Sequence, residues 1–220
     1  MNTLKTEDTG KIAEKAICDL IETPFGGTFK YAQEDVDEMT IRLGPMYETL
    51  AGYVHTGNVD NVYDFKRGEK GLSVKTNKHD TDWKVCPQRI GQTTKKRFCA
   101  YFELPTTDVD SIKTFLTTQT IRALTAYAVN TFHCDILYYN KGSDQVLLIE
   151  PIAAMSFEGH TLTFSHIEKQ KAWNESTTLY IDGKPLGEFQ IHTHRDGVKF
   201  RFQLKTVLDI FKDCFRVTEF

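Results

Sequence analysis

The sequence contains no apolar run that approaches the ~20 residues needed to span a membrane. Its first ten residues are polar and acidic, unlike a secretion signal, in which a basic stretch leads into an apolar one. Glycine and proline, at 14 and 6 of 220 residues, are too few for a collagen-like or low-complexity chain. We therefore expect a cytoplasmic protein that has no membrane partner.

Cysteine is scarce and scattered. The five cysteines are an odd number and include no C-x-x-C pair. In a chain of this length, that distribution favours reduced and mostly buried thiols over a disulfide framework or a zinc site. Apolar side chains are abundant instead: 40% of the residues are hydrophobic and 12% are aromatic, which is enough for a sizeable core.

The net charge of −3 gives no sign of a polyanionic partner, but the charges are unevenly distributed. Residues 1–64 hold 5 basic and 12 acidic side chains, whereas residues 65–97 hold 10 basic and 3 acidic ones. A basic block between acidic segments is typical of a surface that faces a polyanion such as nucleic acid. A solvated loop with scattered lysines would have the same composition, so charge alone leaves both interpretations open.

Hydrophobic periodicity predicts three helical regions. Apolar residues recur at helical spacing in 11–22 and in 34–53, where Gly44-Pro45 indicates a break. The longest predicted helix runs to Phe132 and is expected to be capped by Asp110 or Ser111. These segments predict helices packed by one face against a core.

Strand patterns fill most of the remaining chain. Two short strands are predicted between residues 60 and 77, and further strands at 135–139, 146–152 and throughout 162–204. No linker rich in glycine, serine or proline divides the sequence. We therefore expect a single mixed α/β domain over residues 1–220 with a β-rich C-terminal part.

Residues 186–204 predict a β-hairpin with one polar face. Polar and apolar residues alternate on both sides of Asp196-Gly197, a dipeptide typical of two-residue hairpin turns. Closing the turn there sorts every side chain onto an apolar or a polar face. On the polar face, this register pairs His192 with Arg201 and His194 with Lys199.

Cations that face each other across strands are mildly destabilising unless an anion relieves them. DNA phosphates and guanine edges would do so, and a two-stranded ribbon fits the major groove. The hairpin residues expected to contact DNA are Gln190, His192, His194, Arg195, Lys199 and Arg201. A solvent-exposed hairpin kept soluble by its charges is the alternative. A metal site at the two histidines is disfavoured by the facing cations.

Asp64, Ser73 and Lys75 form a candidate catalytic group. Ser73 and Lys75, two residues apart on a strand, share a face and can converge with Asp64 across a short hairpin. A carboxylate beside a lysine is the minimum for metal-assisted phosphodiester hydrolysis, because the carboxylate holds the cation and the lysine orients the attacking water. The spacing alone would also suit an ordinary strand-edge lysine, and Asp60 competes with Asp64 for the carboxylate role.

Three runs carry a resemblance to a known family: Val62-Tyr63-Asp64-Phe65, then 72–77, then 84–92. Together with the helix that contains Glu14 and the strands 187–192 and 199–202, they resemble the type II restriction endonucleases of the PD-(D/E)XK superfamily. The resemblance implies an α/β fold with a restriction-endonuclease-like mixed sheet flanked by helices. It also implies one nuclease domain over 1–220, with a catalytic core at 1–155 and a β-rich DNA-recognition part at 156–220.

The resemblance implies roles for individual residues. Asp64 would be the metal-binding carboxylate and Lys75 the lysine of the motif, whereas Ser73 stands where the motif usually has Glu or Asp. Some members of the superfamily have Ser there and recruit an acid from a helix, which makes Glu14 the first candidate for a second catalytic carboxylate, ahead of Glu69. The expected metal contacts are Asp64, Val74 and Glu14, for Mg²⁺ with Mn²⁺ as a substitute.

A basic run follows these strands. Gln92 lies at the predicted start of a short helix and could approach the site, and Lys95, Lys96 and Arg97 follow it. All four are expected to contact DNA. Contacts to backbone phosphates supply affinity and position but no choice of sequence.

The activity implied by the resemblance is a Mg²⁺-dependent endonuclease that cuts double-stranded DNA at a short sequence and leaves 5′-phosphate and 3′-hydroxyl ends. The sequence leaves open whether it acts as a monomer or a homodimer. A structure-selective DNA repair nuclease is one alternative. Another is a non-catalytic nucleic-acid-binding module, in which Ser73 marks a decayed catalytic site.

Overall fold

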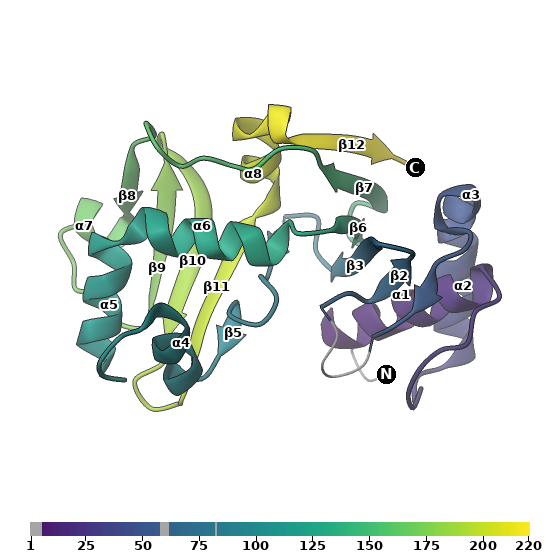
Figure 1. The fold of residues 1–220 in the computed structure, drawn as a ribbon, viewed down its shortest axis with the longest axis horizontal. Helices are drawn as coiled ribbons and strands as arrows, with labels where there is room; N and C mark the ends of the chain where they lie inside the picture. The colour runs from purple at the N-terminus through teal and green to yellow at the C-terminus, as the bar shows by residue number, and fades with distance from the viewer. Residues whose placement is uncertain (1–5, 58–61, 82) are drawn as a thin grey trace. The chain divides into compact units, whose positions relative to one another are not determined.

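A computed structural model of the chain describes residues 6–57, 62–81 and 83–220 (Figure 1). Asp60, the rival of Asp64, lies outside the described residues. The contacts of the chain divide it into two compact units, and the single nuclease domain expected over 1–220 stays a prediction. The first unit comprises Met1–Trp83, Cys134–Pro151 and Phe215–Phe220, and the second comprises Lys84–His133 and Ile152–Cys214.

The first unit is built on a mixed β-sheet. Its strand order is β1-β2-β3-β6-β7-β12, in which β3 and β6 are parallel and the other neighbours are antiparallel. The strands are β1 (Val54–His55), β2 (Phe65–Arg67), β3 (Lys70–Asn77), β6 (Asp135–Asn140), β7 (Gln145–Pro151) and β12 (Phe215–Glu219). Of the predicted strands, the two between residues 60 and 77 correspond to β2 and β3, and those at 135–139 and 146–152 correspond to β6 and β7.

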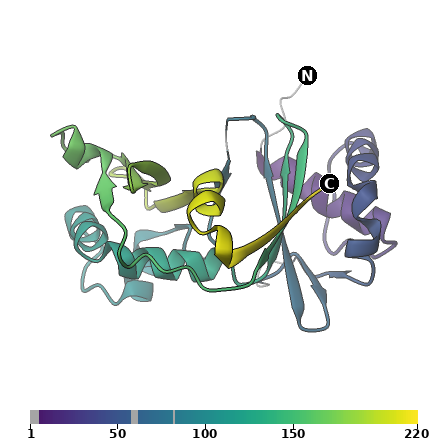
Figure 2. The same ribbon diagram turned by 90° about the horizontal axis from the view of Figure 1, so that it is seen from above.

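Helices α1 and α2 lie on the same face of this sheet (Figures 1 and 2). α1 (Thr6–Leu20) packs on β3, and its Ala13, Ala16 and Ile17 are fully buried in the core that also contains Leu72 and Val74 of β3. α2 (Gln33–Leu43) is followed by the 3₁₀ turn η1 (Gly44–Met46) and by α3 (Tyr47–Leu50). The break predicted at Gly44-Pro45 is confirmed, because proline at the second position fits the start of a new turn and not the interior of a helix.

The second unit is built on an antiparallel sheet. Its strand order is β4-β11-β10-β9-β8, and β5 pairs with β11. The strands are β4 (Lys84–Val85), β5 (Gln92–Thr93), β8 (Leu162–Phe164), β9 (Ser176–Ile181), β10 (Lys184–Ile191) and β11 (Val198–Gln203). The helices are α4 (Lys95–Phe102), α5 (Val109–Thr118), α6 (Thr120–Thr131), α7 (Ser165–Glu168) and α8 (Leu204–Ile210), followed by the 3₁₀ turn η2 (Lys212–Cys214). Gln92 therefore lies on a strand, and its predicted place at a helix start is wrong.

One face of this sheet packs against aromatic side chains of the helices. Tyr127 of α6 stacks on Phe200 of β11, with ring centroids 4.5 Å apart. Phe200 in turn lies 4.5 Å from Phe189 of β10. These contacts place residues 84–133 in the same unit as residues 152–214. The predicted division into a catalytic core at 1–155 and a DNA-recognition part at 156–220 stays a prediction. A mixed α/β architecture is confirmed, and within the described ranges no helix is long and apolar enough to span a membrane.

The single long helix predicted to end at Phe132 is wrong, because the chain forms two helices there. Gln119 leaves the helical conformation, with φ −121° and ψ 37°, and separates α5 from α6. The adjoining threonines bond back to the preceding turn, as when Thr120 Oγ1 donates to Leu116 O at 2.8 Å. Such bonds bend helices. The cap of α5 is Asp108, which accepts from the Ser111 N–H, and neither of the predicted residues.

The predicted hairpin exists, but its register is wrong. Glu188, not His192, is paired with Arg201, and Gln190 is paired with Lys199. The strands join through a loop over 192–197, closed by the His192 N–H on Gly197 O at 3.1 Å. The shift is an even number of residues, so every side chain keeps its predicted face. The predicted crowding of cations is therefore replaced by a pairing of opposite charges.

All five cysteines are free thiols, as predicted from their number and spacing. Three of them are buried and the other two are half-buried. They contribute to the two cores as small apolar side chains.

Candidate active site and nucleic-acid interface

Asp64 lies immediately before β2 and is held by hydrogen bonds to residues of β3 and to Thr56, which follows β1. Its N–H donates to Leu72 O at 3.0 Å, and its carbonyl accepts from the Thr56 N–H at 2.8 Å. Oδ2 of its carboxylate accepts from Ser73 Oγ at 3.0 Å and from the Val74 N–H at 2.7 Å. Within the described ranges, Oδ1 has no hydrogen-bond partner. The carboxylate is therefore fixed in position while one oxygen stays available to a cation.

Lys75 follows on the same face of β3 as Ser73, since the two are separated by one residue. Its ammonium has no ion pair or hydrogen bond in the described part of the chain. Burial raises the pKa of the Cys134 thiol to about 12, while the charge of Lys75 lowers it and that of Asp64 raises it. Lys75 follows Val74, whose N–H donates to the Asp64 carboxylate at 2.7 Å, so the two charged residues meet in the same part of β3. This arrangement offers an anionic oxygen for a metal and a cation for a phosphate.

Val74 turns its side chain toward the core beneath α1, where it is 8% exposed. Its N–H is used by Asp64. Any contact with a metal would therefore come from the main-chain carbonyl of Val74.

Glu14, the predicted second metal ligand, is engaged elsewhere. Its buried carboxylate pairs with Lys11 at 2.7 Å and with His55 Nε2 at 3.0 Å. The Gly26 N–H donates to His55 Nδ1 at 3.0 Å, so Nε2 carries the proton and donates to Glu14.

His55 also shows which side of the sheet Glu14 occupies. It is paired with Phe65 on the face that packs against α1, whereas Asp64 bonds to Ser73 on the opposite face. The structure thus brings Ser73 but not Glu14 to Asp64. Among the described residues, no group of three or more His, Cys, Asp or Glu side chains gathers to hold a metal.

The two roles of Glu14 lead to different expected results for Glu14→Ala. If the pairing with His55 is its role, the buried His55 N–H loses its acceptor, and the free energy of unfolding falls by about 1–3 kcal/mol. The affinity for Mg²⁺, measured by titration calorimetry, should not change. Glu34→Ala, at an exposed position of α2, is the matched control and should stay within about 0.5 kcal/mol of the parent. Weaker Mg²⁺ binding with unchanged stability would instead support a role as metal ligand.

A cavity of about 600 Å³ in the second unit gathers most of the predicted DNA contacts. Two segments distant in sequence form it, because β5 pairs with β11 and because Asp196 Oδ1 accepts from the Lys95 N–H at 2.9 Å. The predicted residues that line it are Gln92, Arg97, Gln190, His192, Arg195 and Lys199. Cations outnumber the single carboxylate, Asp196, among its lining residues. The cavity therefore presents amide and cationic donors toward an anion.

Four predicted contacts lie outside this lining. His194 and Lys96 are exposed, and Lys95 contributes its main-chain N–H to the Asp196 contact. Arg201 instead pairs with Glu188, with Nη2 and Oε2 2.9 Å apart. The sequence pattern did not identify this pairing, because it assumed the wrong hairpin register.

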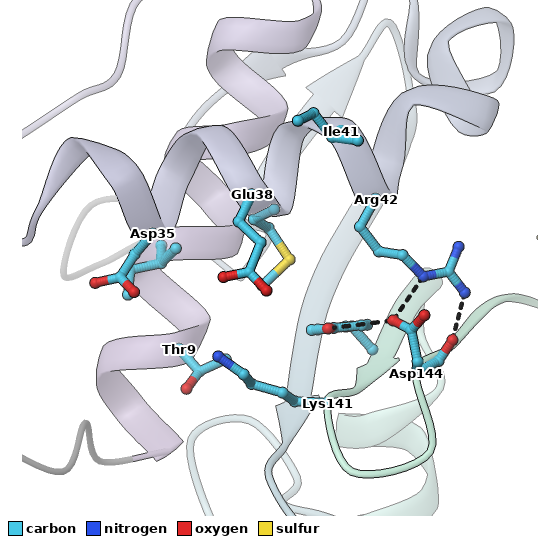
Figure 3. Close-up of a pocket in the computed structure, with 10 residues that line it drawn as sticks. Thr9, Asp35, Glu38, Ile41, Arg42, Lys141 and Asp144 are labelled. Carbon is cyan, nitrogen blue, oxygen red and sulfur yellow. Dashed lines mark hydrogen bonds and ion pairs between the residues drawn. The ribbon is translucent and has the colours of Figure 1, made fainter.

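A second cavity, of about 380 Å³, lies in the first unit and was not predicted (Figure 3). Asp35 and Glu38 of α2 line it, facing Lys141 and Asp144 from the turn between β6 and β7. Arg42 Nε bonds to Asp144 Oδ1 at 2.7 Å, which ties α2 to that turn. None of the predicted catalytic residues lines this cavity.

No model of a known protein family matches the chain, and no solved structure matches it. The chain is 40% identical over 217 residues, 98% of its length, to the type II restriction enzyme CviAII of Paramecium bursaria Chlorella virus 1. The chain resembles a type II restriction enzyme. It spans 63% of the length of this curated relative. The resemblance to type II restriction enzymes inferred from the motifs is thereby confirmed.

Proposed function

We propose that this chain is a type II restriction endonuclease, which hydrolyses phosphodiester bonds of double-stranded DNA at a short specific sequence and depends on Mg²⁺. The observation that carries the proposal is its 40% identity to CviAII over 98% of the chain, which spans both units. Asp64 and Lys75 are the residues to which we assign the chemistry. The products we expect are 5′-phosphate and 3′-hydroxyl ends.

We assign the first unit to the PD-(D/E)XK fold. In support, α1 precedes an antiparallel pair, β2 and β3. Asp64 lies immediately before β2, Lys75 lies on β3, and β3 is joined on its other side to the parallel strand β6. The sheet is mixed, as the motif resemblance implies, and helix α1 packs on it.

The oxygen atoms of the Asp64 carboxylate are suitable ligands for a Mg²⁺ ion. Mg²⁺ prefers oxygen ligands, keeps several waters and binds through one or two carboxylates together with substrate phosphates. Asp64 supplies a fixed carboxylate with one unpaired oxygen, and Ser73 holds it in place. The bound metal supplies Lewis acidity that polarises the scissile phosphate. Mn²⁺ accepts the same ligands and is the expected substitute.

Lys75 contributes the positive charge. Its ammonium, free of ion pairs in the described part of the chain, donates hydrogen bonds to the attacking water and to the phosphate oxygens. The negative charge on those oxygens grows in the transition state, so the stabilisation is stronger there than in the ground state. Ser73 acts through Asp64, which it fixes.

The second unit supplies the binding surface for duplex DNA. The side chains of Arg97, Arg195 and Lys199 offer charge to phosphates, and those of Gln92 and Gln190 offer paired donors and acceptors to base edges. This division of labour gives the protein affinity from charge and choice of sequence from the amides.

The test is digestion of several plasmids by the purified chain with Mg²⁺, with Mn²⁺ and with EDTA. We expect the same discrete fragments with either metal and none with EDTA. Ligase should rejoin the fragments without prior phosphorylation, because their ends carry 5′-phosphates. Cleavage confined to branched or mismatched DNA would favour a repair nuclease. Sequence-specific binding without cleavage under any condition would favour a non-catalytic module.

A further inference from the structure

One carboxylate organises three donors on the polar face of the second sheet. Glu188 of β10 faces Arg201 of β11 directly, and its Oε2 accepts from Arg201 Nη2 at 2.9 Å. The same oxygen lies 3.4 Å from Lys84 Nζ. Oε1 accepts from Gln190 Nε2 at 3.2 Å. The side chains of Glu188 and Arg201 are only 23% and 24% exposed, so solvent screens this pair less than an ordinary surface pair.

The carboxylate is held in its charged form. Burial raises the pKa of Glu188, but the hydrogen bond from Gln190 and the charges of Lys84 and Arg201 more than offset this, and the net shift is downward. A charged carboxylate fixes the planar guanidinium of Arg201 more firmly than a neutral acceptor would.

Arg201 has donors left over. Its Nη1 has no partner among the described residues, and one hydrogen of Nη2 remains after the bond to Glu188. Arg201 and Glu188 line a cavity of about 280 Å³ together with Thr178 and Gln203. Gln190, fixed by the same carboxylate, lines the neighbouring cavity of about 600 Å³. Glu188 therefore sets the orientation of a polar side chain in each of two adjacent cavities.

We propose that Glu188 is a positioning residue that determines sequence specificity, by holding Arg201 and Gln190 ready for base edges in the major groove of duplex DNA. The proposal rests on the function proposed above. Arginine suits the two acceptors of guanine, and glutamine suits the donor and acceptor of adenine. The target therefore contains a G·C pair beneath Arg201, while Glu188 itself does not touch the DNA.

Loss of the Glu188 charge should change the affinities for target DNA and for random DNA in different directions. Without the carboxylate, Arg201 gains rotamer freedom that must be lost again on binding a specific base, so binding to the target weakens. Removing a negative charge from the face at the same time favours contact with phosphates of any sequence. Affinity for the target should fall while affinity for random DNA holds or rises.

The experiment compares Glu188→Gln, Arg201→Lys and the double variant in a Lys75→Met background without metal, so that no DNA is cut. The probes are a duplex with the sequence at which the wild-type chain cuts plasmids, read from the fragment ends, and a shuffled duplex of the same composition. The control is Asp209→Asn, which removes an exposed carboxylate paired with Lys184 in the same unit. Thermal unfolding of each variant checks its folding.

We expect the ratio of target to shuffled affinity to fall about tenfold or more in each single variant, as for loss of one bidentate base contact. The double variant should be no more than about twofold worse, because Glu188 acts through Arg201. The control should keep the wild-type ratio. Should Glu188→Gln not fold, Glu188→Asp, which keeps the charge but shortens the reach, must show the same fall.

An unchanged ratio in the Glu188 variants, or additive losses in the double variant, would overturn the proposal. A fall of equal size for both duplexes would also do so, since it would make the cluster a general phosphate contact. If the wild-type chain yields no discrete plasmid fragments, the proposed function fails first and this proposal fails with it.

Discussion

Replacing Asp64 by Asn is expected to lower the rate of plasmid cleavage about a thousandfold or more. The amide keeps the size of the side chain and can still accept from Ser73, but it loses the negative charge that we propose holds the cation. Stabilisation by a metal amounts to several kcal/mol, and each ~1.4 kcal/mol is a tenfold change in rate. Cleavage should be measured at saturating DNA across a range of Mg²⁺ concentrations.

The matched control for Asp64→Asn is Asp80→Asn, at an exposed position in the same unit. This variant should cleave at the wild-type rate. Calorimetry should show Mg²⁺ binding lost in Asp64→Asn and retained in Asp80→Asn. Near-normal cleavage by Asp64→Asn would mean that another carboxylate, such as the rival Asp60, carries the metal.

Lys75→Met is expected to lower the cleavage rate about 10²–10³-fold while affinity for the target duplex changes less than about threefold. The substitution keeps the length of the side chain and removes the positive charge that we propose stabilises the reacting phosphate, a loss comparable to that of one transition-state donor. Single-turnover cleavage and a binding titration measure the two quantities separately. Loss of binding in parallel with cleavage would instead make Lys75 a simple phosphate contact.

Lys66→Met provides the comparison for Lys75→Met. Lys66 is exposed on β2 of the same unit and carries the same charge. The Lys66→Met variant should cleave within about twofold of the wild-type rate, since exposed charges are strongly screened. That result is expected if a positive charge matters only where it contacts the reacting phosphate. A similar loss in both variants would point to general electrostatic attraction of DNA.

Much of the secondary structure could be predicted, because local patterns determine it. The apolar stripe of α1, the break at Gly44-Pro45 and the continuous apolar run of β7 each reflect residues close in sequence. The division into α5 and α6 could not be seen in this way. No glycine or proline marks Gln119, and the break depends on hydroxyl groups that bond back to the preceding turn.

The hairpin register could not be predicted from local sequence, because it depends on a contact with a residue far away in the chain. Asp196-Gly197 is a strong turn signal by itself, but the Asp196 carboxylate is used by the N–H of Lys95, 101 positions earlier in the chain. The loop consequently opens to 192–197, and each residue of β11 pairs with a residue four positions earlier in the chain than predicted. Glu188 thereby replaced His192 as the neighbour of Arg201.

The candidate site was likewise predictable only where its contacts are between residues close in sequence. Ser73 was expected beside Asp64 because a short hairpin joins their strands, and the structure places them in contact. Glu14 was expected there because the family resemblance implies an acid supplied by the first helix, and Glu14 borders the apolar stripe of that helix. Its partner His55 comes from β1, a strand of two residues that no local pattern indicated.

The path of the chain between the two units has a consequence for folding. β3 and β6 are adjacent parallel strands, yet the whole of 84–133 lies between them in sequence and belongs to the other unit. β7 and β12 likewise enclose 152–214. A nascent chain that has emerged only through residue 83 still lacks β6, β7 and β12, so its sheet ends at β3 with an unpaired edge. High sequence separation between paired strands slows folding. During synthesis the first unit should therefore close last, after the segments that interrupt it have folded into the second.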